Sequence, residues 1–167
     1  MQSEIIAIQI QPFGDKYTDA VISLILPIQQ IEFGVPVTAL DQPDLLDIPN
    51  YYFKGAGNFW IATINEKVIG SIGLLDFGNG NFALRKMFVA KEYRGVTFNI
   101  AQQLWQTAKD WVSNHDGCEI YLGTVEILIA AHRFYEKNGF LRVNQKDLPP
   151  DFPRMTVDTV FYRFQIR

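Results

Sequence analysis

The sequence predicts an α/β domain whose mixed, largely antiparallel sheet is flanked by helices. Three patterns indicate this architecture. Residues 58–89 are rich in strand-forming side chains and are divided by two short turns, as in a meander. In the second half of the chain, two segments carry apolar residues three or four positions apart, which is typical of helices. Each helical segment follows a short apolar run, and strands that alternate with helices build α/β folds.

The first third of the chain predicts a strand, a helix and an irregular connector. Isoleucine-rich residues 4–10 favour a strand, because β-branched side chains are enriched in sheets. After Asp15, apolar residues recur at helical spacing, and Pro27 is expected to kink that helix or to begin a second one. Residues 34–57 contain three prolines and predict a connector with short helical turns, near the substrate end of the fold.

The next segment predicts a three-stranded antiparallel meander. Phe59, Ile61 and Ile64 mark the first strand, and residues 65–67 form a turn. A second turn falls at residues 78–80, where Asn and Gly adopt the backbone angles that tight hairpins require.

A long helix and a short strand follow the meander. In residues 93–117, the apolar positions lie at helical spacing, and Gly117 is placed to end the helix. These positions are Ile100, Leu104, Ala108 and Trp111. Residues 118–124 then predict a short buried strand.

A second helix and a last strand complete the chain. Residues 125–139 predict a helix that turns Ile127, Ala130 or Ala131, and Phe134 inward, and that ends at Asn138-Gly139. A proline-rich loop leads from there to a strand over residues 158–166.

Length and composition limit the classes of function that the chain can have. A chain of 167 residues fits one core, so we expect residues 1–167 to form a single domain. The net charge of -3 and the pI of about 5.3 exclude a broad nucleic-acid-binding surface and favour small-molecule ligands. Cys118 is the only cysteine, and the sequence shows no secretory signal pattern and no apolar run long enough for a membrane segment. We therefore expect a cytoplasmic protein.

A possible anion site lies in LRKMFVAKEYRGVTFNIAQQL, where a turn joins a strand to a helix. Free amide groups and the positive end of the helix dipole attract phosphate oxygens at such a helix start. Arg94 and Gly95 open the turn, and Gly95 permits a positive φ or a close approach of a ligand to the backbone. An ordinary surface turn has the same composition, so this junction alone leaves both interpretations open.

A second junction, EIYLGT followed by EILIAAHRFYEKNGF, makes the pattern more specific. A strand ending in MFV, the turn EYRG, an amphipathic helix and a later AAHRFYEKNGF together resemble the GNAT family of N-acetyltransferases. The resemblance covers residues 4–166, with FYEKNGF as its sharpest part. It implies an acyl-CoA N-acyltransferase fold in one domain, with strands 83–89 and 119–124 splayed around acetyl-coenzyme A (acetyl-CoA).

The resemblance also implies which residues bind acetyl-CoA. Backbone groups at the end of the first splayed strand pair with the pantetheine arm, and the loop before the long helix holds the diphosphate. Thr97 and Asn99 depart from the family, which has glycine, or glycine and alanine, at these positions. Their side chains are expected either to crowd the phosphates or to add donors, and Asn99 alternatively is a simple helix N-cap. The implied residues are Met87, Phe88, Val89, Arg94, Gly95, Val96, Thr97, Phe98, Asn99, Ala131, Tyr135 and Lys137.

Tyr135 stands at the position of the family's tyrosine in the Phe-Tyr-x-Lys segment. The resemblance implies that its hydroxyl protonates the departing thiolate of coenzyme A. The alternative is a tyrosine that packs on the sheet with its hydroxyl at the surface. Lys137 likewise either approaches the cofactor phosphates or is a solvated cation at a helix C-terminus.

An amine attacks only in its neutral form, so such an enzyme needs a base. Glu32, just beyond the first helical region, is the leading candidate for the base or the amine anchor. Asp76 and a chain of water molecules are the alternatives. The acidic residues of this part of the chain weakly favour a cationic amine as acceptor; they are Glu32, Asp41, Asp44 and Asp47.

The remaining polar and aromatic residues predict no further site. His132 lies four residues before Glu136, but two histidines without clustered cysteines or carboxylates do not make a metal site, so we expect an exposed helix pair and no metal. Trp105 and Trp111 are interpreted as packing residues.

These observations predict an N-acetyltransferase that passes an acetyl group from acetyl-CoA to the primary amine of a small molecule, or of a peptide, by direct attack in a ternary complex. The alternative is a non-catalytic GNAT-fold binding or sensor module with altered coenzyme A affinity. A nucleotide-binding α/β domain ranks third, because no G-x-G-x-x-G run follows the first strand. A homodimer is possible through the edge of the last strand.

Overall fold

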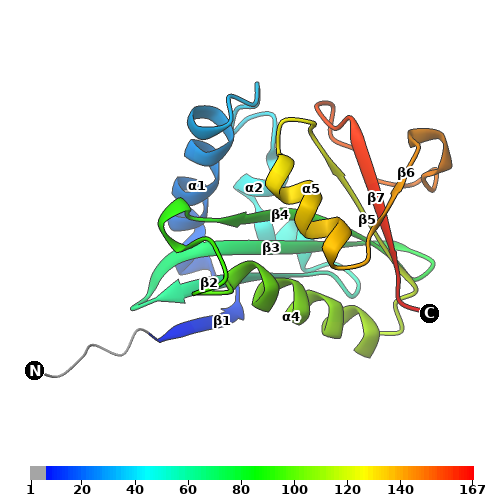
Figure 1. Ribbon diagram of the computed structural model, residues 1–167. Coiled ribbons are helices and arrows are strands. Elements are labelled where there is room, and N and C mark those ends of the chain that lie inside the picture. The colour runs from blue at the N-terminus through cyan, green and yellow to red at the C-terminus, as the bar shows by residue number, and fades with distance from the viewer. Residues whose placement is uncertain (1–6) are drawn as a thin grey trace, which may run out of the picture.

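The computed structural model describes residues 7–167, which form a seven-stranded sheet with helices on both faces (Figure 1). The strand order is β1-β2-β3-β4-β5-β7-β6, and all neighbours are antiparallel except the parallel pair β4 and β5. This confirms the predicted mixed, largely antiparallel α/β fold. The strands are β1 (Ile8–Pro12), β2 (Asn58–Ile64), β3 (Lys67–Gly78), β4 (Asn81–Val89), β5 (Glu119–Thr124), β6 (Leu141–Val143) and β7 (Val160–Gln165).

Five α-helices lie within the described residues: α1 (Thr18–Pro27), α2 (Pro43–Leu46), α3 (Ile48–Tyr52), α4 (Ile100–Asn114) and α5 (Ile129–Lys137). Short helical turns add to them: η1 (Asp15–Tyr17), η2 (Ile28–Glu32), η3 (Lys91–Tyr93) and η4 (Gln145–Asp147). In residues 7–167 no helix has the length and apolar character that crossing a membrane requires.

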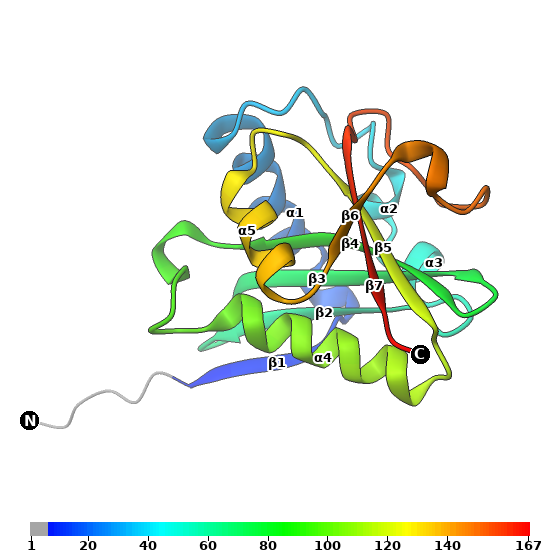
Figure 2. The ribbon, with the colours of Figure 1, turned by 45° about the vertical axis from the view of Figure 1, so that its right-hand side comes forward.

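The sheet separates the core into two layers, and helices cover each layer from outside (Figure 2). On one face, Leu104 and Trp105 of α4 pack against the apolar side chains of β2, β3 and β4. On the other face, Val21 and Ile25 of α1 pack beside the short helix α3. The expected packing role of Trp105 is confirmed, and Trp111 is half-buried against Trp60.

The predicted meander is present as β2, β3 and β4, and its first strand is buried on both faces. All residues of β2 are buried, because successive side chains enter opposite core layers. Phe59 and Ile61 join the layer under α1, whereas Trp60 and Ala62 join the layer under α4. Burial on both faces explains why the sequence lacks a clean apolar–polar alternation here.

One expectation for the first third of the chain needs correction. The first strand spans Ile8–Pro12 instead of residues 4–10, and positions 4–6 lie outside the described residues. The expected second helix at Pro27 is confirmed, because α1 ends at Pro27 and the π-helical turn η2 begins at the next residue. The predicted short helical turns of the connector are present as α2 and α3.

The second predicted helix is shorter than expected. α5 begins at Ile129 and not near residue 125, so Ile127 precedes the helix and is 57% exposed. The prediction that Ile127 faces inward is therefore wrong. Ala131 and Phe134 are half-buried and pack against the core, while Ala130 is exposed.

The central strands β4 and β5 diverge, as the resemblance implied. They pair in parallel only at Asn81–Ala83 with Glu119–Tyr121, and β5 then continues alongside β7 while β4 continues alongside β3. A bulge in β4 accompanies the divergence: between Arg85 and Phe88 the register with β3 shifts, and Lys86 has a φ of 53°. The edge of β4 that faces β5 is therefore open beyond Ala83.

The buried face of β3 provides a test of the packing. Ile72 is completely buried, so Ile72→Ala is expected to lower the free energy of unfolding by about 2–5 kcal/mol through lost burial and a residual cavity. Ile31 is 81% exposed, so the matched variant Ile31→Ala should change the free energy of unfolding by about 0.5 kcal/mol or less. Urea unfolding followed by tryptophan fluorescence measures both values, and equal losses would contradict this core.

Candidate functional site

A cavity of about 350 Å³ opens where β4 and β5 diverge. Its walls come from the end of β4, the loop after it, the first turn of α4, and α5, so the two sequence junctions meet around one hollow. Ile28 and Phe33 close it from the side of α1. The predicted cofactor-binding residues that line it are Met87, Phe88, Val89, Arg94, Gly95, Val96, Asn99, Ala131, Tyr135 and Lys137.

Two residues of the predicted set, Thr97 and Phe98, do not line this cavity. Thr97 is exposed to solvent. The ring of Phe98 packs edge-on against Tyr93, with 5.4 Å between the ring centroids. The side chain of Phe98 therefore closes the loop onto itself, while the backbone of the same loop borders the cavity at Gly95 and Val96.

The loop before α4 contains two residues in left-handed backbone conformations. Gly95 has a φ of 105°, which favours glycine, and the space where its Cβ would lie is open. Asn99 has a φ of 55°, and asparagine is among the side chains that best tolerate this region. This conformation gives a physical reason for asparagine at a position where the family usually has a small residue.

Asn99 occupies the N-cap position of α4, but its side chain makes no capping hydrogen bond within the described part of the chain. The simple N-cap interpretation is therefore incomplete. The first amides of an α-helix have no partner inside the helix, so those of α4 are available where the helix start borders the cavity.

Arg94 and Glu32, predicted for different roles, bind each other. The guanidinium donates from both terminal nitrogens to the Glu32 carboxylate, one of them at 2.8 Å, and its Nε donates to the carbonyl of Val89 at 2.8 Å. The hydrogen bond from Arg94 lowers the pKa of Glu32, although partial burial opposes it. A carboxylate held in its charged form by an arginine is a weak proton acceptor, which disfavours Glu32 as the base.

Asp76, the second candidate base, holds two turns together. Its carboxylate accepts hydrogen bonds from the amide of Ala56 at 2.9 Å and from the amide of Gly78 at 3.0 Å. Asp76 lines neither of the two cavities at the splayed strands.

Tyr135 is 93% buried and lines the cavity from α5, where its ring packs against Phe140 and Tyr162. Burial first, and then the charges of Tyr162 and Asp158, raise the pKa of the Tyr135 phenol well above its usual value. The phenol therefore stays protonated near neutral pH and is available as a proton donor. Exposed Lys137 lies near the end of the same helix and borders the cavity.

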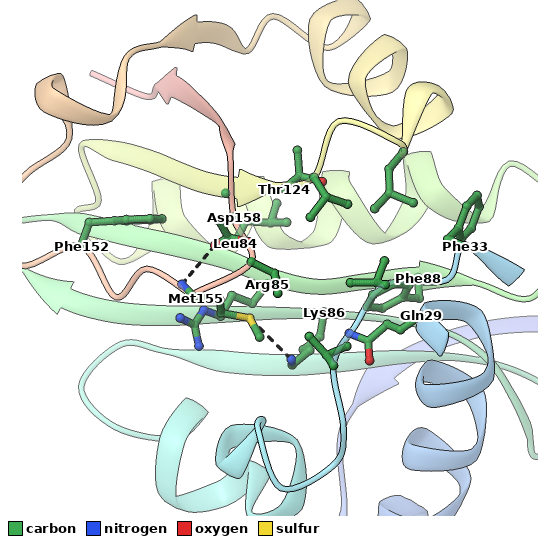
Figure 3. A pocket seen from close by; sticks show the side chains of 16 residues that line it. Gln29, Phe33, Leu84, Arg85, Lys86, Phe88, Thr124, Phe152, Met155 and Asp158 are labelled. Atoms are coloured by element: carbon green, nitrogen blue, oxygen red, sulfur yellow. Dashed lines mark hydrogen bonds between the residues drawn. The ribbon is translucent and has the colours of Figure 1, made fainter. Parts of the chain in front are cut away.

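A second, smaller cavity of about 100 Å³ adjoins the first (Figure 3). Both cavities are lined by Phe33, Phe88 and Leu128, so they meet between β4 and the loop before α5. Apolar residues form most of its wall, and its polar side chains come from Gln29, Arg85, Lys86, Thr124 and Asp158.

A buried charged cluster lies beside this second cavity. Lys86 is 94% buried, donates to the Oε1 of Gln42, and has its Nζ 3.6 Å from Asp44. Arg85 also approaches Asp44 at 3.6 Å, and the hydroxyl of Tyr52 donates to the same carboxylate. Burial lowers the pKa of Lys86, while Asp44 opposes that shift. Two cations therefore share one buried carboxylate.

This cluster changes the expectation of an acidic acceptor site. Asp44 is neutralised by Arg85 and Lys86, and Glu32 by Arg94. The other two acids bond to their own loops: Asp41 accepts the amide of Thr38, and Asp47 accepts the side-chain amide of Asn50. The acids that suggested a cationic acceptor therefore do not form an open acidic surface.

Sequence reasoning missed Arg85, Lys86 and Asp158. Two adjacent cations among the apolar residues of a predicted strand, as in LRKMFV, are a signal for Arg85 and Lys86, because buried charges need partners. Asp158 has no comparable signal, since it follows a proline-rich loop where an exposed acid is ordinary.

His132 is engaged within the fold and does not form the expected exposed pair with Glu136. Its Nδ1 lies 3.0 Å from the hydroxyl of Tyr162 and its Nε2 lies 3.0 Å from the carbonyl of Val125. Across residues 7–167, no group of three or more metal-ligating side chains comes together.

The sequence of the chain matches known proteins. The acetyltransferase (GNAT) family model matches residues 23–140. The N-acetylaspartate synthetase of Xenopus tropicalis is 33% identical over 128 residues, which make up 74% of this chain and 46% of that protein. The matched region makes up between 34% and 46% of the N-acetylaspartate synthetases of five vertebrates, so the chain corresponds to less than half of those proteins.

Solved structures match over nearly the whole chain. A GNAT-family acetyltransferase from Staphylococcus aureus is 37% identical and has a TM-score of 0.93, covering 96% of this chain and 100% of its own. The PaiA N-acetyltransferase of Thermoplasma acidophilum, solved in complex with coenzyme A, shares the fold at 14% identity, with a TM-score of 0.76 over 96% of this chain and 99% of its own. Because the family model covers most of the chain and a 37% identical structure has the same fold, the chain belongs to the GNAT family of acetyltransferases.

Proposed function

We propose that the protein is an N-acetyltransferase that moves the acetyl group of acetyl-CoA to the primary amine of a small molecule. The observation that carries this proposal is the cavity between the splayed strands, which joins a helix start, an open strand edge and the phenol of Tyr135. The smaller adjoining cavity is the proposed acceptor site, because it meets the first cavity at Phe88 and Leu128.

The backbone supplies most of the proposed acetyl-CoA site. The edge of β4 beyond Ala83 has no partner in β5, which supports pairing of the peptide groups at Met87 and Phe88 with the pantetheine arm. The loop from Gly95 to Asn99 and the first amides of α4 border the cavity, which supports binding of the diphosphate there. Arg94 is proposed as a further member of this anion site, with its guanidinium positioned by Val89 and Glu32.

Direct transfer fits the residues better than a covalent acyl-enzyme. Cys118, the only thiol in the sequence, precedes β5 and lies against Gly80, at the end of the strands away from the splay. In the proposed step, the amine nitrogen attacks the thioester carbonyl, the C–N bond forms and the C–S bond breaks. Tyr135 then gives its proton to the departing thiolate, so coenzyme A leaves as a thiol, and the proton that the amine nitrogen loses restores the phenol.

The proposed acceptor is an amine that also carries a carboxylate. Three cations, Arg85, Lys86 and Arg154, lie around two carboxylates, Asp44 and Asp158, so an acceptor carboxylate would balance the remaining positive charge. The relatives named N-acetylaspartate synthetase agree with this class, since aspartate is an amine of this kind. A polyamine would instead bring further positive charge to the two cations.

The central experiment measures binding and turnover separately. Calorimetry with coenzyme A is expected to show binding, and thiol release from acetyl-CoA is expected with carboxylate-bearing amines such as α-amino acids. Polyamines and amino sugars are the comparison acceptors and should react at least about tenfold more slowly, the equivalent of one mismatched charge worth about 1.4 kcal/mol.

Two outcomes would overturn parts of this proposal. Binding of coenzyme A without thiol release on any amine would support the alternative, a GNAT-fold sensor module. Faster turnover with polyamines would retain the enzyme and refute the acceptor class.

Removal of the Tyr135 hydroxyl tests its role as acid. Tyr135→Phe is expected to lower kcat about 100-fold or more, because the thiolate would leave without a positioned proton donor. The Kd for coenzyme A should stay within about twofold, since the ring and its packing remain. Tyr51→Phe, at a more exposed tyrosine, is the matched control. An unchanged kcat would remove Tyr135 from the chemistry and leave it as a packing residue.

A substitution can decide whether Glu32 only positions Arg94 through their ion pair or accepts the proton of the amine. Glu32→Gln breaks a partly exposed ion pair with Arg94, which is worth up to about 1 kcal/mol, so the KM for acetyl-CoA should rise about two- to fivefold. If Glu32 only positions Arg94, the Glu32→Gln variant should keep the kcat of the wild type and the acid limb of its pH profile. Glu92→Gln, two residues before Arg94, is the control, because Glu92 is exposed. If Glu32→Gln abolishes the acid limb, Glu32 is the base after all.

A further inference from the structure

Asp158 places a buried carboxylate in the proposed acceptor cavity (Figure 3). The residue is 93% buried and lies two residues before the last strand of the chain, β7. Its Oδ2 accepts a hydrogen bond from the amide of Met155 at 3.1 Å. On the other side it lies against Gly123 of β5, where a Cβ would come within 2.5 Å of Oδ2. Gly123 thus leaves the space that the carboxylate occupies.

The other carboxylate oxygen of Asp158 is open to a ligand. Within residues 7–167, every side-chain nitrogen or oxygen that is sealed from solvent has a hydrogen-bond partner. Oδ1 of Asp158 has none among these residues, so it is not sealed, although the residue as a whole is buried. Because Asp158 lines the acceptor cavity, we take this oxygen to be the one that meets a ligand there.

Three cations and one neutral phenol lie within electrostatic reach of Asp158. Arg85 and Lys86 belong to β4, Arg154 belongs to the same loop as Asp158, and the phenol of Tyr135 belongs to α5. Burial raises the pKa of Asp158, and the amide of Met155 and the three cations only partly offset this. The charge of Asp158 in turn contributes to the raised pKa of Tyr135, so the two groups lie within electrostatic reach of each other.

We propose that Asp158 is the catalytic base that takes a proton from the acceptor amine. This inference rests on the proposed N-acetyltransferase function. The acceptor ammonium gives one proton to Oδ1 of Asp158 and becomes a neutral nucleophile. Its nitrogen attacks the thioester carbon, and Tyr135 protonates the sulfur as the C–S bond breaks. The nitrogen loses its second proton, which restores the Tyr135 phenol, and Asp158 returns the first proton to solvent.

The other buried or loop carboxylates are less suited to this step. Glu32 is held in its charged form by Arg94, and Asp44 is bonded to Tyr52 and faces two cations. Asp76 bridges two backbone amides outside both cavities. Asp158 is the carboxylate among residues 7–167 that lines the acceptor cavity and keeps an oxygen free.

The variant Asp158→Asn tests the inference in the full-length protein. It should lower kcat with a strongly basic amine about 100- to 1,000-fold, because general bases contribute about that much. Below the pKa of the amine, the kcat/KM of the variant should rise about tenfold per pH unit, because the fraction of neutral amine rises by that factor. The loss should shrink for weakly basic amines, an effect that a merely structural role would not produce. Asp151→Asn, at an exposed acid of the same loop, should behave like the wild type.

Folding and cofactor binding are checked alongside turnover. A raised pKa in the folded state means that the charged carboxylate costs stability at neutral pH, so Asp158→Asn should melt no lower than the wild type. Its Kd for coenzyme A should be unchanged. Gly123→Ala is a second test, because the added Cβ displaces the carboxylate without removing it, and a comparable loss of kcat is expected.

The outcomes separate this inference from the proposed function. Wild-type turnover together with full activity of Asp158→Asn on strongly basic amines would refute the base and leave the enzyme assignment intact. Absence of turnover in the wild type on every amine would overturn both.

Discussion

The site depends on one constraint: β4 and β5 stop pairing after Ala83 and Tyr121. The bulge at Lys86 accompanies this divergence, and a non-glycine residue in the left-handed region costs about 1–2 kcal/mol. Local bonds offset that cost: Ser71 donates to the Lys86 carbonyl at 2.6 Å, and the Lys86 ammonium reaches Gln42 and Asp44. Because the strand bends here, one edge of β4 opens toward the large cavity, and Arg85 and Lys86 line the small one.

The same charged cluster ties the proline-marked connector to the sheet. Asp44 belongs to α2 and meets Lys86 and Arg85 of β4 in the interior, and Tyr52 of α3 donates to the same carboxylate. Removing one partner of such a set leaves an uncompensated buried charge, which destabilises more than the pair itself stabilises. The connector therefore has a fixed position against β4 through Asp44 and Tyr52, although its sequence has the composition of a loop.

The sequence could predict features that rest on local patterns, and it failed where distant segments meet. The meander, the long helix and the loop at Gly95 follow from strand-forming runs, helical spacing and glycine. The exposure of Ile127 depends on where α5 begins, and helix boundaries are weakly encoded. The ion pair of Glu32 with Arg94 joins segments far apart in the chain, so no local sequence pattern could show that Glu32 is paired and therefore a poor base.

The two carboxylates that were weighed as the base, Glu32 and Asp158, lie in different environments. Glu32 faces a guanidinium at the partly exposed rim, which favours its charged form and lowers its pKa. Asp158 is enclosed between β5 and its own loop, and burial outweighs its cationic neighbours, so its pKa rises. A base must hold a proton during the step and release it afterwards, which a carboxylate with a raised pKa does better. Because burial creates that property, the fold that splays the central strands also selects which acid can serve.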